Sequence, residues 1–122
     1  MISSITLIKN RNIKGRIKMD FYLFIVTVPN IEEGKKIARS LVESRLAACV
    51  NIIKDISSVY RWKGEIQEDN EHLLLIKTTE DKSEPLIQKI KAIHSYSEPE
   101  CIGFKVEKGS QKYLNWIKDV VD

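Results

Sequence analysis

The side chains best suited to metal chemistry in this sequence are two histidines, His72 and His94, and two cysteines, Cys49 and Cys101. Imidazole nitrogens and thiolates are ligands that copper and zinc prefer. The four residues do not follow the short spacing of a metal-binding motif. We take His94 and Cys49 as the candidate ligands for copper or another divalent cation. Each also has a structural interpretation, since His94 suits the carboxyl end of a helix and Cys49 suits an apolar strand.

A run of acidic residues offers oxygen ligands instead: Glu65, Glu68, Asp69 and Glu71. Carboxylate oxygens suit hard cations such as Mg²⁺ and Ca²⁺. Spread along one strand-like segment, the same residues are also typical of a solvated face that protects a strand from aggregation. His72 belongs to this segment and is expected to face solvent or an interface. Both interpretations of the acidic run stay open at this point.

Large aromatic side chains form another group: Tyr60, Trp62, Tyr113 and Trp116. Such side chains could stack on a ligand. Because they bury much area and keep a polar atom, they are also typical anchors of subunit interfaces. We predict that these four residues lie in an interface between copies of the chain.

Catalytic motifs are missing from the sequence. It contains no glycine-rich phosphate loop, no paired-histidine metal motif, and no nucleophile with a base at a telling spacing. Acylphosphatases carry an arginine in a phosphate loop after their first strand, and residues 27–30 here are Thr-Val-Pro-Asn. Residues 101–106 lack the aromatic and basic pattern of RNA-recognition domains. We therefore expect a protein that is not an enzyme and does not bind nucleic acid.

The net charge of +3 is unevenly distributed along the 122 residues. Residues 1–18 carry five basic and no acidic side chains, so the rest of the chain has a net charge of −2. Such a segment is typical of a nucleic-acid arm or a targeting signal. We interpret it as a poorly ordered extension ahead of a functional start at Met19, followed by one domain over residues 19–122. A membrane-spanning run and a disulfide pattern are both absent, which favours the cytoplasm.

Two long strand-like segments, residues 48–62 and 65–78, flank Lys63 and Gly64. Glycine accepts the positive φ that a tight hairpin needs, so we place the hairpin turn at Lys63 and Gly64. Each arm would be roughly 45 Å long if unbroken. A domain of this size is only about 33 Å across. The hairpin must therefore bend, protrude, or pair with something outside its own fold.

Shorter elements precede and follow the hairpin. Residues 21–28 form an apolar run typical of a buried strand, and Asn30 with Glu33 predicts a capping box at the start of a helix. A second helix is predicted over 83–94, a last strand over 101–106, and a terminal helix after Ser110. The order β-α-β-β-α-β plus one helix indicates an α+β, ferredoxin-like fold with two helices on one face of a four-stranded antiparallel sheet. The other face is left bare, so we expect further copies of the chain to cover it in a closed ring.

Four separated segments follow one another in a characteristic order: residues 41–51 (LVESRLAACVN), 58–66 (SVYRWKGEI), 76–78 (IKT) and 113–117 (YLNWI). Over residues 20–120 the chain thereby resembles the CutA family of divalent-cation tolerance proteins. The resemblance implies a ferredoxin-like fold, a tight homotrimer built through the long hairpins, and binding of copper or other divalent metal ions. It also implies an architecture similar to the PII signal proteins, and hence an alternative function as a small-ligand sensor with clefts between subunits.

The segment before the last strand departs from the family pattern. Members of the family usually have His-Pro-Tyr-Glu-x-Pro-Glu there, and this chain has HSYSEPE at residues 94–100. Some members have been assigned a copper site of one cysteine and two histidines. The matching positions here are Val26, Ile93 and His94, so only His94 retains a ligand side chain.

Overall fold

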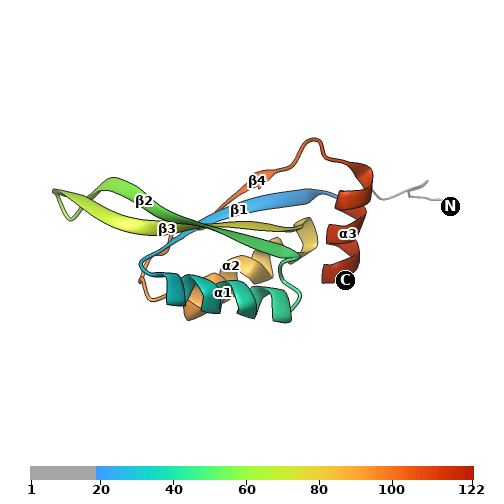
Figure 1. The fold of residues 1–122 in the computed structure, drawn as a ribbon, viewed down its shortest axis with the longest axis horizontal. Helices are drawn as coiled ribbons and strands as arrows, with labels where there is room; N and C mark the ends of the chain where they lie inside the picture. Colours follow the sequence, from blue (N-terminus) through green and yellow to red (C-terminus); the bar gives the residue numbers. More distant parts are fainter. Residues whose placement is uncertain (1–18) are drawn as a thin grey trace.

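Four strands form one antiparallel sheet in the computed structural model, which describes residues 19–122. The strands are β1 (Phe21–Val28), β2 (Cys49–Trp62), β3 (Glu65–Thr79) and β4 (Ile102–Lys105), and their order across the sheet is β2-β3-β1-β4 (Figure 1). All three neighbouring pairs are antiparallel. The predicted α+β class, with four strands and three helices, is confirmed. The predicted extension, residues 1–18, lies outside the described residues.

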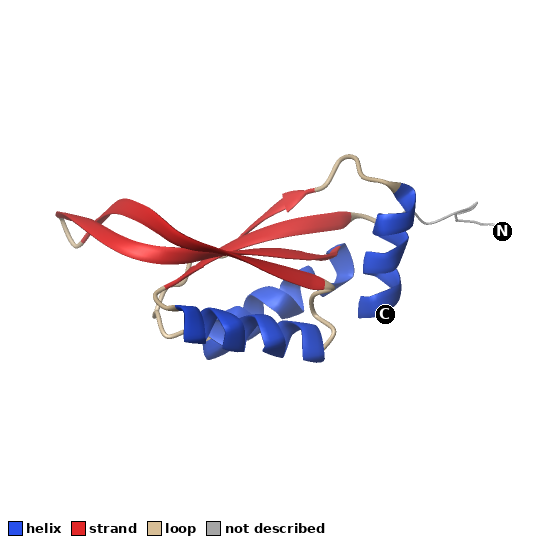
Figure 2. Cartoon of the chain, viewed as in Figure 1, coloured by secondary structure: helices blue, strands red, loops and turns tan. Residues whose placement is uncertain are grey.

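Two helices cover one face of the sheet (Figure 2). They are α1 (Ile31–Glu43) and α2 (Ser83–Ile93), and a 3₁₀ turn at Glu80–Lys82 leads into α2. Their apolar sides pack on alternate residues of β1 and β3, because successive strand residues point to opposite faces. The core lies in this layer, and its fully buried members are Val26, Val28, Ile37, Leu41, Leu74, Ile76, Leu86 and Ile90.

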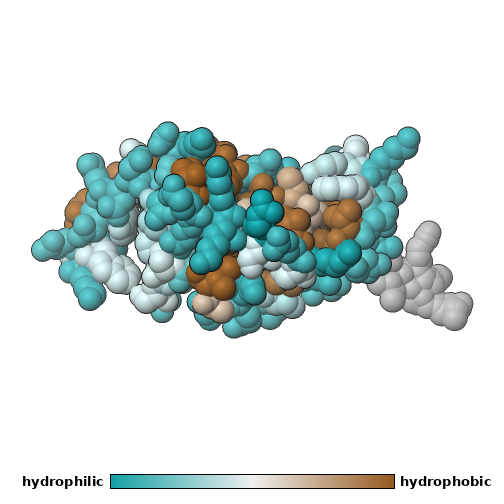
Figure 3. Space-filling view, turned by 60° about the horizontal axis from the view of Figure 1, so that its bottom comes forward, coloured by the Kyte–Doolittle hydropathy of each residue, from teal (hydrophilic) through white to brown (hydrophobic). Residues whose placement is uncertain are grey.

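The outer face of α1 and α2 is polar. Figure 3 brings this face forward and shows hydrophilic side chains over most of it, with apolar side chains in separate groups. A helix with one apolar and one polar side is what a two-layer fold requires. Within residues 19–122, none of the helices is long and apolar enough to cross a membrane.

The start of α1 confirms half of the predicted capping box. The Glu33 N–H donates to Asn30 Oδ1 at 2.8 Å, which satisfies one of the free amides of the first turn. The Glu33 carboxylate does not return to the Asn30 backbone. It accepts instead from the Ser95 N–H, also at 2.8 Å. This acidic side chain therefore connects α1 to the loop that follows α2.

The hairpin of β2 and β3 extends well beyond the helices (Figure 1). Its turn consists of Lys63 and Gly64, with φ of 50° and 83°, the left-handed values that two-residue hairpin turns need. The partner strand β1 pairs with β3 only as far as His72. The outer half of the hairpin is therefore a two-stranded ribbon that protrudes from the domain.

A third helix, α3 (Gln111–Val121), lies at the opposite end of the sheet from the hairpin turn (Figure 1). Ile117 and Val121 pack there against Phe21 and Ala48 in a second, smaller cluster. The other side of α3 carries exposed aromatic rings. This arrangement agrees with a helix whose apolar stripe is wider than one contact surface requires.

The sheet face opposite α1 and α2 carries a continuous set of apolar side chains. Opposed residues in an antiparallel pair share a face, so the pairing identifies the set as Leu23, Ile25, Ile53, Leu73, Leu75, Ile102 and Phe104. Ile53, Ile102 and Phe104 are about half exposed, at 45%, 49% and 53%. We call this set the open face.

Candidate functional site

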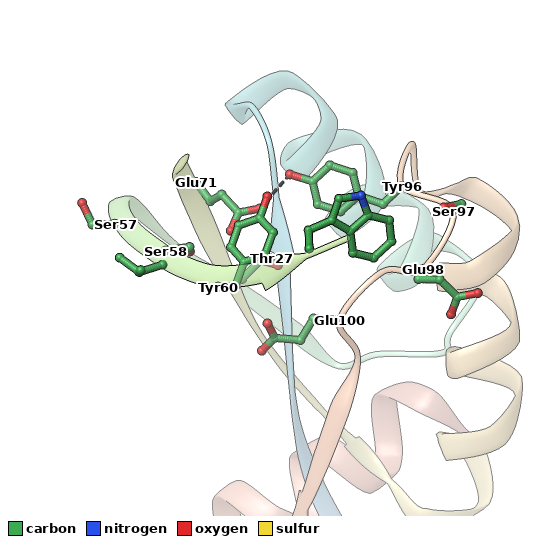
Figure 4. Close-up of a pocket in the computed structure, with 11 residues that line it drawn as sticks. Thr27, Ser57, Ser58, Tyr60, Glu71, Tyr96, Ser97, Glu98 and Glu100 are labelled. Carbon is green, nitrogen blue, oxygen red and sulfur yellow. Dashed lines mark hydrogen bonds between the residues drawn. The ribbon is translucent and has the colours of Figure 1, made fainter. Parts of the chain in front are cut away.

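A cavity of about 720 Å³ lies where the outer half of the hairpin meets the loop between α2 and β4. β1, β2 and β3 form part of its wall, and residues 96–100 of the loop form another part (Figure 4). Cavities of this size are typical of small-ligand sites. Its lining residues are Thr27, Ser57, Ser58, Val59, Tyr60, Trp62, Glu71, Tyr96, Ser97, Glu98 and Glu100.

A β-bulge determines which hairpin residues face this cavity. Ile53 pairs with Leu73 and Ile56 with Glu71, so Lys54 and Asp55 together stand opposite the single residue His72. One extra residue reverses the facing of every later position in β2. Beyond the bulge, Tyr60 and Trp62 therefore share the face of Glu71. Without the bulge, Val59 and Arg61 would share the face of Glu71 instead.

The bulge is held by His72. Asp55 has a φ of 60°, and its N–H donates to His72 Nδ1 at 3.0 Å. His72 is only 7% exposed, so the prediction that it faces solvent is wrong, and its alternative place in an interface stays a prediction. The bulge interrupts the strand ladder and leaves the Asp55 amide without a backbone partner, and the His72 imidazole accepts its hydrogen bond instead.

The lining of the cavity is acidic. Glu71, Glu98 and Glu100 contribute carboxylates, and the lining contains no lysine, arginine or histidine. Glu71 is 6% exposed and accepts a hydrogen bond from Tyr96 Oη at 2.7 Å. Burial, together with this hydrogen bond, raises the pKa of Tyr96 well above its ordinary value, so its hydroxyl remains a donor. Thr27 also lines the cavity and is 8% exposed.

Tyr60 extends the acidic group toward the hairpin turn. Its hydroxyl donates to the Asp69 carboxylate on the facing strand. The hydrogen bond to Asp69 raises the pKa of Tyr60 above its ordinary value. Glu71, Tyr60 and Tyr96 gather at one side of the cavity, whereas Glu98 and Glu100 lie apart from them (Figure 4).

His94, a predicted metal ligand, is buried with both ring nitrogens in hydrogen bonds. Nε2 lies 2.8 Å from the Thr27 carbonyl oxygen, which can only accept. Nδ1 accepts from the Tyr96 N–H at 3.0 Å, and an amide can only donate. The partners therefore specify the neutral imidazole with its proton on Nε2. A metal ion would have to displace one of these two partners.

Cys49, the other predicted ligand, is not brought near His94. Cys49 pairs with Lys77 on β3, which in turn pairs with Leu23 on β1. His94 contacts β1 at the Thr27 carbonyl. Thr27 is four residues beyond Leu23, which is about 13 Å along the strand. Within residues 19–122 no three His, Cys, Asp or Glu side chains are grouped so that they could hold a metal ion. The single chain therefore does not bring His94 and Cys49 together, and their role as metal ligands stays a prediction.

The four predicted interface aromatics lie in two separate groups. Tyr60 and Trp62 are on the protruding hairpin, and Tyr113 and Trp116 are on α3, where their rings lie 5.5 Å apart. Lys77 Nζ lies 5.7 Å from the centre of the Tyr113 ring. All four side chains are between 41% and 48% exposed.

Sequence reasoning missed the loop residues of the cavity. Tyr96, Glu98 and Glu100 belong to the HSYSEPE segment, which the sequence marked only through His94. Glu71 was included in the acidic run, as an oxygen ligand for hard cations or as part of a solvated face, and its burial beside Tyr96 was not expected. The available signal was the density of polar residues between two predicted elements, because functional side chains concentrate on such loops.

Comparison with known proteins places the chain in a family. The family model described as CutA1 divalent ion tolerance protein matches residues 22–120. Protein CutA, chloroplastic, from Arabidopsis thaliana is 52% identical over 94 residues, which cover 77% of this chain and 52% of that protein. The divalent-cation tolerance protein CutA of Thermus thermophilus is 45% identical over 95 residues, which cover 78% of this chain and 92% of that protein.

The fold comparison agrees. The crystal structure of CutA from Xylella fastidiosa superposes with a TM-score of 0.83 at 40% identity, covering 84% of this chain and 99% of that one. This chain spans about half the length of the Arabidopsis relative and nearly all of the Thermus relative. Residues 22–120, which the family model matches, contain the strands and helices described above except for the first residue of β1 and the last residue of α3. The chain therefore belongs to the CutA family of divalent-cation tolerance proteins.

Proposed function

We propose that this protein serves divalent-cation tolerance as a homotrimer that binds cations and does not catalyse a reaction. Hydrated divalent cations bind in the acidic cavity at the base of the protruding ribbon. The observation that carries this proposal is a cavity lined by three glutamates and by no basic side chain.

Assembly into a trimer is supported by the open face and the hairpin. A sheet whose second face is apolar is stable in water when another layer covers it. The two-stranded outer ribbon also offers unpaired strand edges, which a neighbouring copy can complete. The cavity lies beside that ribbon, so neighbouring copies close it further in the proposed trimer.

The donor atoms in the cavity favour hard cations over copper. Carboxylate, hydroxyl and carbonyl oxygens suit Mg²⁺, Mn²⁺ and Ca²⁺, whereas copper prefers imidazole and thiolate ligands. Mg²⁺ keeps several of its waters and is commonly held by only one or two carboxylates. This mode of binding does not require three converging protein ligands. Glu98 and Glu100 are exposed and free to approach such a hydrated ion.

Calorimetric titration with Mn²⁺ tests the cavity. We expect the double change Glu98→Gln and Glu100→Gln to weaken Mn²⁺ binding at least about tenfold, because affinity for hard cations follows the number of charged ligands. The matched control is Glu84→Gln on α2, since Glu84 pairs with Gln88 outside the cavity. Equal Mn²⁺ affinity of the double variant and the control would remove the cavity from the proposal.

A parallel titration with Cu²⁺ tests the ligands predicted from the family resemblance. Because His94 and Cys49 are far apart and His94 is hydrogen-bonded, we expect His94→Ala and Cys49→Ser to bind Cu²⁺ as the unaltered protein does. Stoichiometric Cu²⁺ binding that both changes abolish would restore the original site. The small-ligand sensor suggested by resemblance to PII proteins stays a prediction.

A further inference from the structure

Glu71 is a buried carboxylate without a cationic partner. It lines the cavity and is 6% exposed, and no basic side chain of residues 19–122 forms an ion pair with it. Its Oε2 accepts from the Tyr96 hydroxyl, whereas its other oxygen has no hydrogen-bond partner among the described residues. A buried charge is unfavourable unless a counterion and hydrogen bonds compensate it. This part of the cavity therefore suits a cation that carries N–H or O–H donors.

Thr27 provides a second buried polar atom in the same cavity. It is 8% exposed, and its backbone carbonyl contacts His94, but within the described part of the chain its hydroxyl takes part in no hydrogen bond. Thr27 pairs with Leu73, which is two residues from Glu71 on the same face of β3. The side chains of Thr27 and Glu71 are therefore diagonal neighbours, roughly 7 Å apart. An ammonium group between them has three donors and can reach both oxygens.

Three aromatic side chains also line the cavity: Tyr60, Trp62 and Tyr96. The face of an aromatic ring attracts an alkylammonium group, and it covers methylene groups, whose removal from water is favourable. A hydrated divalent ion gains little from such a wall, because its bound waters separate it from the rings. The aromatic wall therefore suits an organic cation.

The carboxylates occupy two separate places in the cavity. Glu71 lies with Tyr60 and Tyr96 at one side, and Glu98 and Glu100 lie apart from them (Figure 4). A ligand with a single charged group can pair with only one of these places. A linear molecule with an ammonium group at each end pairs with both, and its methylene chain then lies along the aromatic wall.

We propose that the cavity binds a linear alkyl diamine, with one ammonium group at Glu71 and Thr27 and the other at Glu98 and Glu100. This inference goes beyond the divalent-cation function and does not depend on it. A hydrated divalent ion and the diamine compete for the exposed Glu98 and Glu100, whereas the buried end of the cavity belongs to the diamine alone.

Calorimetric titration of the whole protein with putrescine and n-butylamine tests the proposal. The two probes have carbon chains of the same length, but only putrescine has a second ammonium group. In metal-free buffer at physiological ionic strength, we expect putrescine to bind at least about tenfold more tightly, the effect of one additional charged hydrogen bond. Equal affinities for the two amines, or no saturable binding of putrescine, would overturn the inference.

Variants at the outer end of the cavity assign one ammonium group. The double change Glu98→Gln and Glu100→Gln should lower the affinity for putrescine about tenfold, to that of n-butylamine. It should leave n-butylamine binding unchanged, because a single ammonium group occupies the buried end. Glu84→Gln, outside the cavity, is the matched control and should change neither affinity. A double variant that weakens both amines equally would contradict the assignment of the two ends.

A variant at the buried end assigns the other ammonium group. Glu71→Gln keeps an acceptor for the Tyr96 hydroxyl and removes the charge, so it should weaken both amines at least about tenfold. Unchanged affinity for both amines in this variant would overturn the inference. Because Glu98 and Glu100 are exposed, their double variant tests the proposal even if Glu71→Gln does not fold.

Titration with Mn²⁺ in the absence of amines separates this inference from the proposed function. Putrescine binding with the expected variant pattern, in a protein that does not bind Mn²⁺, would uphold the diamine site and remove the divalent-cation site. Mn²⁺ binding without saturable putrescine binding would overturn the diamine site alone. Where both bind, saturating Mn²⁺ should lower the affinity for putrescine toward that of n-butylamine, because the ion then occupies Glu98 and Glu100.

Discussion

Burial changes the chemistry of individual side chains in this chain, and Cys101 and Tyr96 are clear cases. Cys101 lies just before β4 and packs against the core, and burial raises the pKa of its thiol to about 11 from an ordinary 9.0. Tyr96 is held neutral by burial and by Glu71. In both residues the protonated, uncharged form is the one that suits the folded chain.

Slow alkylation of Cys101 is the expected outcome at neutral pH. Only the thiolate reacts, so at pH 8 a thiol of pKa about 11 should react with iodoacetamide roughly 100-fold more slowly than an ordinary thiol. Mass spectrometry of the peptide that contains Cys101 measures this rate. The same peptide in the urea-unfolded chain is the control, and equal rates in both states would contradict the prediction.

The same shift gives the sign of a stability effect at alkaline pH. When folding raises the pKa of a thiol, the protonated thiol stabilises the folded state. For Cys101 this contribution to the free energy of unfolding is complete below the unfolded pKa of 9.0 and is lost as the pH rises through the folded pKa. The Cys101 contribution should therefore fall between pH 9 and about 11. Tyr96, whose pKa is also raised, acts in the same direction at still higher pH.

At the scale of elements, local patterns explain most of the fold. The four strands and α2 begin and end within one residue of their predicted bounds, and α1 and α3 begin where predicted, because apolar periodicity, Asn30 and Gly64 are local signals. The bulge has no such signal. Lys54-Asp55 contains no glycine, and the left-handed Asp55 is supported by His72, which is 17 residues away.

The cavity escaped prediction for the same reason. The facing of Tyr60 and Trp62 depends on the bulge, and the position of Tyr96 depends on His94 and Glu71. These contacts join residues between 2 and 25 positions apart. The sequence therefore identified the hairpin's acidic and aromatic residues by type. Their meeting with the loop residues in one cavity depends on the bulge and on the contacts of Tyr96 with His94 and Glu71.

Gly103 is an element-scale test of how β4 fits the sheet. A Cβ at this position would stand 2.6 Å from Phe24 Cε2 on the neighbouring strand, and Phe24 is only 3% exposed. Because the ring cannot move into solvent, we expect Gly103→Ala to lower the free energy of unfolding by about 1–3 kcal/mol. Urea denaturation monitored by circular dichroism measures the loss.

A double-mutant cycle attributes the effect to this contact. In a Phe24→Leu background the crowded ring atoms are gone, so adding Gly103→Ala should cost less than it does in the unaltered chain. The cost should remain the same in both backgrounds if the alanine acts only through the backbone. That result would show that Phe24 is not the reason for glycine at position 103.

At the scale of the whole molecule, the chain carries apolar surface that its own helices do not cover. α1 and α2 occupy one face of the sheet, and α3 covers only the end near Phe21 and Ala48. The open face and the ribbon that holds Trp62 remain accessible. Exposed apolar surface of this kind marks a contact with another molecule, and further copies of the chain are the partner we propose.

Trp62 distinguishes assembly from folding of the single chain. It is 48% exposed and belongs to neither core cluster, so Trp62→Ala should leave the circular dichroism spectrum of the chain nearly unchanged. Buried tryptophans at the centre of interfaces commonly contribute about 2 kcal/mol or more, which corresponds to roughly a 30-fold weaker association. Sedimentation velocity over a dilution series should show the trimer dissociating at higher protein concentration than it does in the unaltered protein.

Val42→Ala removes a side chain of similar exposure, 43%, from α1 and should not change assembly. A trimer that stays intact in Trp62→Ala at the same dilution would place the principal contact elsewhere, on the open face or on the aromatic side of α3.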